Sequence, residues 1–118
     1  MAISKAARTL QASASNASAA TATGTAVNLN AALGGVAGGK ITNGATGPTI
    51  PAQFVLEVSH DGTNWYELAR FTAGVANSAI YSFAQDVPPG VMQVRSVFTG
   101  NTAQAVTVEA YFQELTSI

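Results

Sequence analysis

The chain has 118 residues, no cysteine and a formal net charge of −1. This length suits one domain with one core, and the lack of cysteine excludes disulfides, thiolate nucleophiles and cysteine-ligated metal sites. Only 9% of the residues are charged, against roughly 25% in typical soluble domains, and no basic cluster exists that could neutralise successive phosphates, so nucleic acid is not expected as a partner.

Residues 1–24 are predicted to form an extended N-terminal arm. Residues 3–10 fit a strand or a short helix, and residues 11–24 are a low-complexity stretch of small side chains. Residues 12–26 are too polar for a signal peptide or a membrane span. Because so few large apolar residues cannot form a core, we expect the arm to add a strand to another subunit. The predicted contacts are Ile3, Lys5, Arg8 and Leu10.

Residues 25–118 are predicted to form a β-sandwich domain. The alternation at 27–30 indicates a strand, and a single helical turn at 31–33 would end at the two glycines that follow. Asn43-Gly44 is a turn signal. Pro48 and Pro51 then delay the next strand to about residue 52, because proline cannot donate to a ladder.

Residues 54–71, FVLEVSHDGTNWYELARF, read as a β-hairpin with a polar turn. In its first half Phe54, Leu56 and Val58 share one face. In its second half, strict alternation places Tyr66 and Leu68 on one face of the strand. The other face then carries Trp65, Glu67, Ala69 and Phe71.

Three further alternating segments follow, at 79–84, 91–98 and 104–113, separated by turns at Asp86–Gly90 and Gly100–Thr102. Seven or eight short strands with turn signals between them predict an antiparallel two-sheet β-sandwich. An immunoglobulin-like and a jelly-roll topology both fit, and no helix longer than about two turns is expected. The predicted core comprises Phe54, Leu56, Val58, Leu68, Val94, Val106, Val108 and Phe112.

Two constellations could carry chemistry. His60 and Asp61 could act as a base with its orienting carboxylate or as metal ligands, but sequence neighbours rarely converge on one target, and Asp61 more plausibly caps its turn. Glu57 and Glu67 could form a carboxylate pair for glycoside hydrolysis, although solvated edge carboxylates that discourage aggregation explain them better. We therefore predict no catalytic, cofactor or metal site, and no enzyme.

Aromatic side chains offer a candidate binding site instead. Trp65, Tyr66 and Tyr81 could form a platform for sugar rings, because aromatic rings combine an apolar face with a polar tip. Packing in or over the sandwich core is the alternative, since aromatic residues dominate small cores. A surface glycan is accordingly a candidate ligand.

Several segments resemble small virion proteins of tailed bacteriophages. They are Ser59-x-Asp61-Gly62-x-x-Trp65, AALGG at 31–35, KITNGATGPT at 40–49, DVPPG at 86–90 and FTGNTAQAVTVEAYFQEL at 98–115. The resemblance covers residues from about 4 to 117 and implies capsid decoration or cement, with a neck, tail or fibre-base component as the alternative. It also implies a virion location after assembly in the bacterial cytoplasm, with copies of itself and major capsid or neck and tail proteins as partners.

Overall fold

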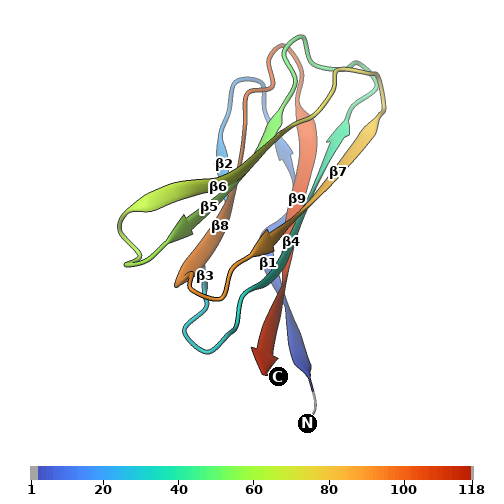
Figure 1. The fold of residues 1–118 in the computed structure, drawn as a ribbon. Coiled ribbons are helices and arrows are strands. Elements are labelled where there is room, and N and C mark those ends of the chain that lie inside the picture. The colour runs from blue at the N-terminus through green and yellow to red at the C-terminus, as the bar shows by residue number, and fades with distance from the viewer. Residues whose placement is uncertain (1–2, 118) are drawn as a thin grey trace.

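The structure, a computed structural model, describes residues 3–117, and these form strands and turns without a helix (Figure 1). In place of the predicted helical turn at 31–33, a single turn spans residues 29–32, closed by a hydrogen bond from the Ala32 N–H to the Leu29 carbonyl at 3.0 Å. None of the described residues belongs to a helix long and apolar enough to cross a membrane. The strands are β1 (Ser4–Asn16), β2 (Ala22–Thr23), β3 (Val27–Asn28), β4 (Gly35–Asn43), β5 (Gln53–Ser59), β6 (Trp65–Thr72), β7 (Ile80–Val87), β8 (Gln93–Thr99) and β9 (Val106–Ser117).

Two antiparallel sheets pack face to face, which confirms the predicted sandwich. The four-stranded sheet has the order β1-β9-β4-β7, and the five-stranded sheet has the order β2-β8-β5-β6 with β3 also paired to β8. The pairs are nested along the chain, because β5 pairs with β6, β4 with β7, β2 and β3 with β8, and β1 with β9. Nested pairs divided between two sheets are the jelly-roll arrangement, so the topology decides between the two predicted alternatives.

The core lies between the sheets, and a set of aromatic rings occupies its centre. Phe54 is fully buried, with its ring 5.1 Å from that of Phe98 and 6.0 Å from that of Phe71. Gly39 of the opposite sheet lets this ring approach, because a Cβ there would lie 2.8 Å from it. Seven of the eight predicted core residues are buried, whereas Leu68 is only partly buried at the edge of the core.

A β-bulge in the hairpin overturns part of the predicted face assignment. Leu56 pairs with Ala69, but the next residue, Glu57, pairs with Glu67, so the ladder skips Leu68. One extra residue reverses the alternation on its strand. Phe71 therefore faces the core, where its ring lies 5.1 Å from that of Phe83, although strict alternation predicts that it shares a face with Trp65.

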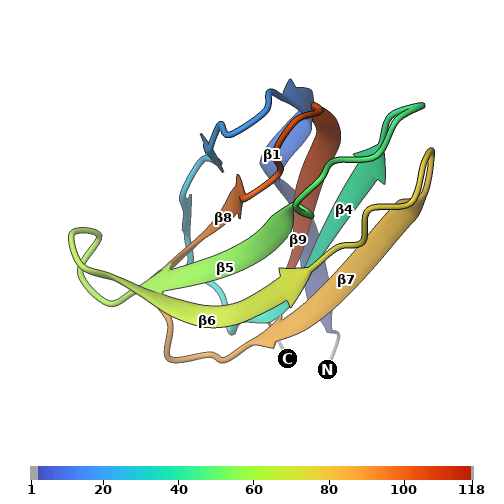
Figure 2. The same cartoon turned by 90° about the horizontal axis from the view of Figure 1, so that it is seen from above.

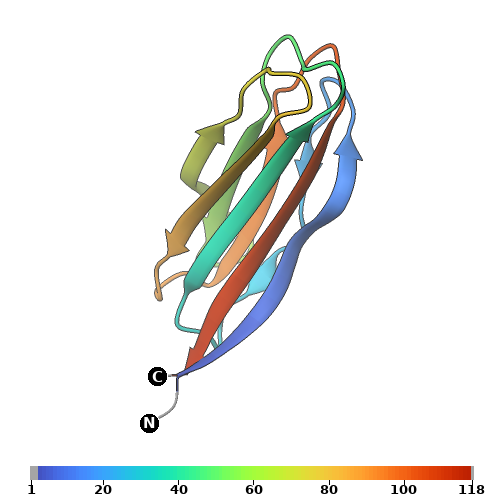
Figure 3. The ribbon, with the colours of Figure 1, turned by 90° about the vertical axis from the view of Figure 1, so that its right-hand side faces the viewer.

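The N-terminal segment is not separate from the sandwich. Residues 4–16 form β1, an edge strand that pairs with β9 along its length (Figure 3). Leu10 is 1% exposed and belongs to the core, so its prediction as a contact to another subunit is wrong. At the far end of β1, Asn16 Nδ2 donates to Oδ1 of the buried Asn101 at 2.8 Å. The sequence does not reveal that β1 belongs to the sandwich, because Leu10 is the only large apolar side chain in residues 4–26.

Candidate interaction surfaces

The turn between β5 and β6 extends beyond the body of the sandwich (Figure 2) and holds the His60-Asp61 pair. The Asp61 carboxylate accepts hydrogen bonds from the backbone N–H groups of Asn64 and Thr63, both at 2.8 Å, and from Asn64 Nδ2 at 2.8 Å. These donors hold the pKa of Asp61 far below its ordinary value of 3.8. The His60 ring instead lies 5.9 Å from the Tyr66 ring. Asp61 therefore caps the turn and does not orient His60.

The Asp61 cap predicts a specific pH dependence. A carboxylate whose pKa is lowered by folding stabilises the fold above its unfolded pKa, and this contribution is lost as the pH falls toward the folded pKa. We expect Asp61→Asn to lower the free energy of unfolding at neutral pH, with the difference from wild type shrinking below about pH 4. Urea unfolding between pH 2.5 and 7 measures this.

Thr46→Ala is the control, because Thr46 is exposed in another loop and its side chain makes no hydrogen bond within the described residues. Its stability should run parallel to that of wild type over the whole pH range. Parallel curves for Asp61→Asn as well would mean that the turn gains nothing from the charged cap.

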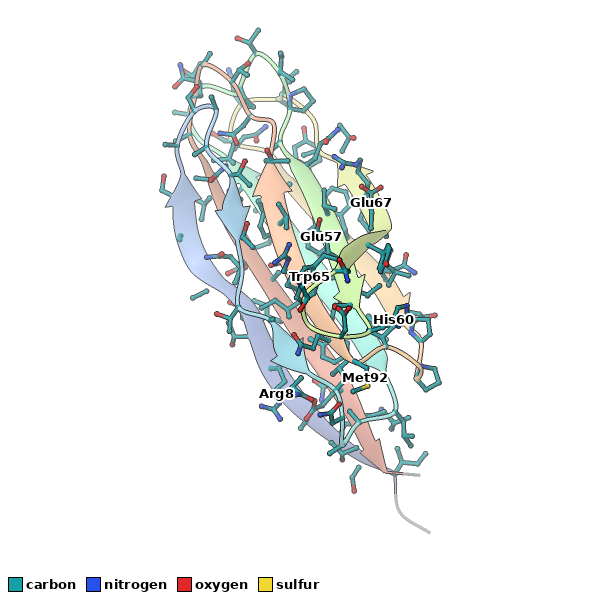
Figure 4. The ribbon with its side chains drawn as sticks, turned by 90° about the vertical axis from the view of Figure 1, so that its left-hand side faces the viewer. Arg8, Glu57, His60, Trp65, Glu67 and Met92 are labelled. Carbon is teal, nitrogen blue, oxygen red and sulfur yellow. The ribbon has the colours of Figure 1, made fainter. Side chains whose placement is uncertain are left out.

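The outer face of the five-stranded sheet carries a ladder of paired charges. Arg95 Nε lies 2.8 Å from Glu57 Oε1, and the guanidinium of Arg95 lies 4.1 Å above the centre of the Trp65 ring. Figure 4 shows Glu57 and Trp65 side by side over this sheet. Beside them Arg70 Nη2 lies 2.7 Å from Glu67 Oε1. The two carboxylates face each other across the β5–β6 pair, but each is held by its own arginine, so they form no acid–base pair.

The three aromatic side chains predicted as a glycan platform do not come together. Trp65 lies on the outer face of β6 with Arg95 over its ring. Tyr66, its neighbour on the strand, points to the opposite face and contacts His60. Tyr81 lies on β7 in the other sheet, where it packs against the core. No shared sugar-binding surface is formed from these rings.

The outer face of the four-stranded sheet carries small and apolar residues around one ion pair, Lys40 with Glu109. A shallow hollow of about 500 Å³ lies over Gly38, with exposed Val36 and Tyr111 on its floor. Lys40 Nζ lies 2.8 Å from Glu109 Oε1, and the Tyr111 hydroxyl donates to Glu109 Oε2 at 3.1 Å. The hydrogen bond from Lys40 lowers the pKa of Glu109, and the Glu109 carboxylate raises the pKa of Tyr111.

Most charged side chains are neutralised within the chain. Of the five basic and six acidic residues, eight form four ion pairs. The fourth pair joins Arg8 Nε to Oε1 of the buried Glu114 at 3.1 Å. The other predicted subunit contacts, Ile3 and Lys5, are exposed at the start of the chain, and their contact with another subunit stays a prediction. Three of the four pairs join residues far apart in the chain, so sequence reasoning could not find them, whereas Glu67 and Arg70 are three positions apart.

Known structures share this fold at low sequence identity. A chain from the infectious bursal disease virus Gx strain aligns with 96% of this chain and 32% of its own length, with a TM-score of 0.67 and 10% identity. The PBSX exported protein XepA aligns with 96% of this chain and 37% of its own length, with a TM-score of 0.67 and 15% identity. A chain of the Bacillus endospore appendages, described as disulfide-linked pili, aligns over 99% and 93%, with a TM-score of 0.54 and 14% identity.

The chain spans about a third of the length of the first two of these proteins. No protein-family model matches the sequence, and comparison with curated protein sequences finds no match. Likeness at this level of identity establishes the fold and not the function.

Proposed function

We propose that this protein is a non-enzymatic structural component of a bacteriophage virion that decorates or cements the capsid shell. The observation that carries the proposal is the surface chemistry. Eight of the eleven charged side chains neutralise one another within the chain, and the outer face of the four-stranded sheet presents small and apolar residues around the Lys40–Glu109 pair, with Lys5 and Asp86 at its two edges. Such a surface gains little solubility from charge and suits burial against neighbouring subunits.

Two further points support this assignment. The sequence motifs resemble those of tailed-phage virion proteins, and chains that share the fold come from infectious bursal disease virus particles. Many copies on a shell convert weak single contacts into strong overall attachment. Among the described residues, the carboxylates of Asp61, Glu57 and Glu67 are each held by a structural partner, and the His60 ring lies beside Tyr66 rather than beside a carboxylate.

Immunogold labelling of particles purified from the host cells that encode the protein tests the assignment, with its copy number measured by quantitative mass spectrometry against the major capsid protein. Label spread over the shell, with a copy number that is a large fraction of that of the capsid protein, is expected. Label confined to the neck, tail or fibre base would replace decoration with the alternative position. Absence of the protein from purified particles would overturn the virion role.

A further inference from the structure

The four-stranded sheet has two free edges that differ in their protection against pairing with another chain. β7 pairs with β4 over eight residue pairs without a bulge, and its residues 80–87 include no proline and a single charge, Asp86. Isolated edge strands normally carry charges, prolines or bulges that prevent pairing. The edge of the other sheet follows that rule, because β6 carries Glu67 and Arg70 and pairs through a bulge. The β7 edge therefore lacks a bulge and a proline, and Asp86 is its one charged side chain.

The opposite edge of the same sheet is β1, and only its first half is free. Residues 5–9 pair with β9 in unbroken register, which leaves their other side open. Farther along, the carbonyl of Leu10 accepts a hydrogen bond from the backbone N–H of Thr25 at 2.9 Å, so the chain itself covers that part of the edge. The free half of β1 lies at the same end of the sheet as the last residues of β7 (Figure 3).

Strand direction allows these two edges to meet. The four strands alternate in direction across the sheet, since every neighbouring pair is antiparallel, so β1 and β7 run in opposite directions. A second copy in the same orientation beside the first would place its β1 antiparallel to β7. The alternation would then continue from one copy to the next without a break.

Charge supplies the second observation. Four ion pairs and the Asp61 cap occupy nine of the eleven charged side chains. Lys5 and Asp86 are the two left without a partner in the described part of the chain, and both are exposed. They have opposite sign and lie on the two free edges. Within one chain their strands are three strand spacings apart, about 14 Å, so they do not pair with each other.

The strand register places Lys5 and Asp86 at similar positions along the strand direction. Ala7, Gln113, Val36 and Asp86 form one row across the outer face, and Lys5 lies two residues from Ala7 on the same face. In a neighbouring copy at the same level, Ala7 would lie opposite Asp86 and Lys5 would be its diagonal neighbour. Diagonal neighbours are about 7–8 Å apart at Cα and within reach of a long side chain.

We propose that copies of this chain associate head to tail, with the β7 edge of one copy paired antiparallel to residues 5–9 of β1 in the next, and with Asp86 and Lys5 as an ion pair across the junction. The contact is heterologous, so repetition closes a ring when the rotation between copies allows it. This inference concerns the purified chain alone and does not depend on the virion role.

Sedimentation velocity of the full chain over a concentration series tests the junction. We expect Lys5→Glu and Asp86→Lys each to weaken association at least about fivefold, because each places like charges together. The double variant should recover to within about twofold of wild type, and association should weaken with added salt. Ala45→Glu and Ala45→Lys are the controls, because Ala45 is exposed in the loop at the other end of the sheet, and both should associate like wild type.

Single cysteines give an independent test, because the chain has none of its own. With a short thiol crosslinker, a mixture of Lys5→Cys and Asp86→Cys should give a covalent dimer, whereas each variant alone should not. Crosslinking of Asp86→Cys alone would indicate a two-fold β7–β7 contact and would overturn the proposal. So would a chain that stays monomeric up to about 1 mM, or association unaffected by both charge reversals.

Discussion

Replacing Phe54 by alanine is expected to lower the free energy of unfolding by about 3–5 kcal/mol, the range for large-to-small changes of buried aromatic residues. Phe54 is fully buried, and its ring lies within 6.3 Å of the rings of Phe71, Phe83 and Phe98. Its removal leaves a cavity between the two sheets and takes away ring contacts that contribute beyond buried area. Urea unfolding monitored by circular dichroism measures the loss.

Ile50→Ala is the matched control, because Ile50 is a large apolar side chain that is 55% exposed in a loop. Its cost should lie within about 0.5 kcal/mol, as for other surface changes. A loss below about 1 kcal/mol for Phe54→Ala would contradict the central position of its ring, since the surrounding side chains would then have to fill the space without strain.

Local patterns were sufficient to predict most of the core. Phe54, Leu56 and Val58 alternate on a regular strand, and so do Val106 and Val108, so a period of two identifies their buried face. The period failed at the bulge beside Glu57, because one inserted residue reverses every later side chain on that strand. No local pattern in the second half of the hairpin indicates that insertion, so strict alternation predicts the wrong face for Phe71.

The topology could not be predicted, because the alternation within each strand does not show which strands pair with one another. Immunoglobulin-like and jelly-roll sandwiches both consist of short alternating strands, and they differ in which distant strands pair. The pairing of β1 with β9 joins residues about a hundred positions apart. Its main anchors are one leucine, Leu10, and one asparagine pair, Asn16 with Asn101, which the small residues around them conceal.

On the candidate surfaces too, local features were predictable from the sequence and contacts between distant strands were not. Turn chemistry was enough to predict the Asp61 cap, because an aspartate in a tight turn bonds to backbone groups two or three residues ahead. The contact of Arg95 with Trp65 was not predictable, since it joins strands β8 and β6 across β5. Lys5 and Asp86 stand out only after every other charge has been assigned a partner.

Deleting residues 1–20 is expected to prevent folding of the remaining domain, in contrast to the separable arm predicted from sequence. The deletion removes all of β1 and exposes the edge of β9. Loss of Leu10 alone leaves a core cavity of the kind that costs about 2–5 kcal/mol. It also leaves buried Glu114 without Arg8 and buried Asn101 without Asn16. Since domains are stable by only about 5–15 kcal/mol, these losses together exceed what the fold can tolerate.

Circular dichroism and proton–nitrogen correlation spectra of the truncated chain test this expectation. Removing only residues 1–3 is the control, because it leaves β1 intact, and this variant should fold. Adding a synthetic peptide of residues 1–20 to the larger truncation should restore the native spectrum, since an edge strand can be supplied as a separate chain through backbone pairing. A truncated chain that keeps native dispersion and a cooperative unfolding transition without the peptide would show instead that the sandwich is complete without β1, and that its first strand is free to serve a neighbouring subunit.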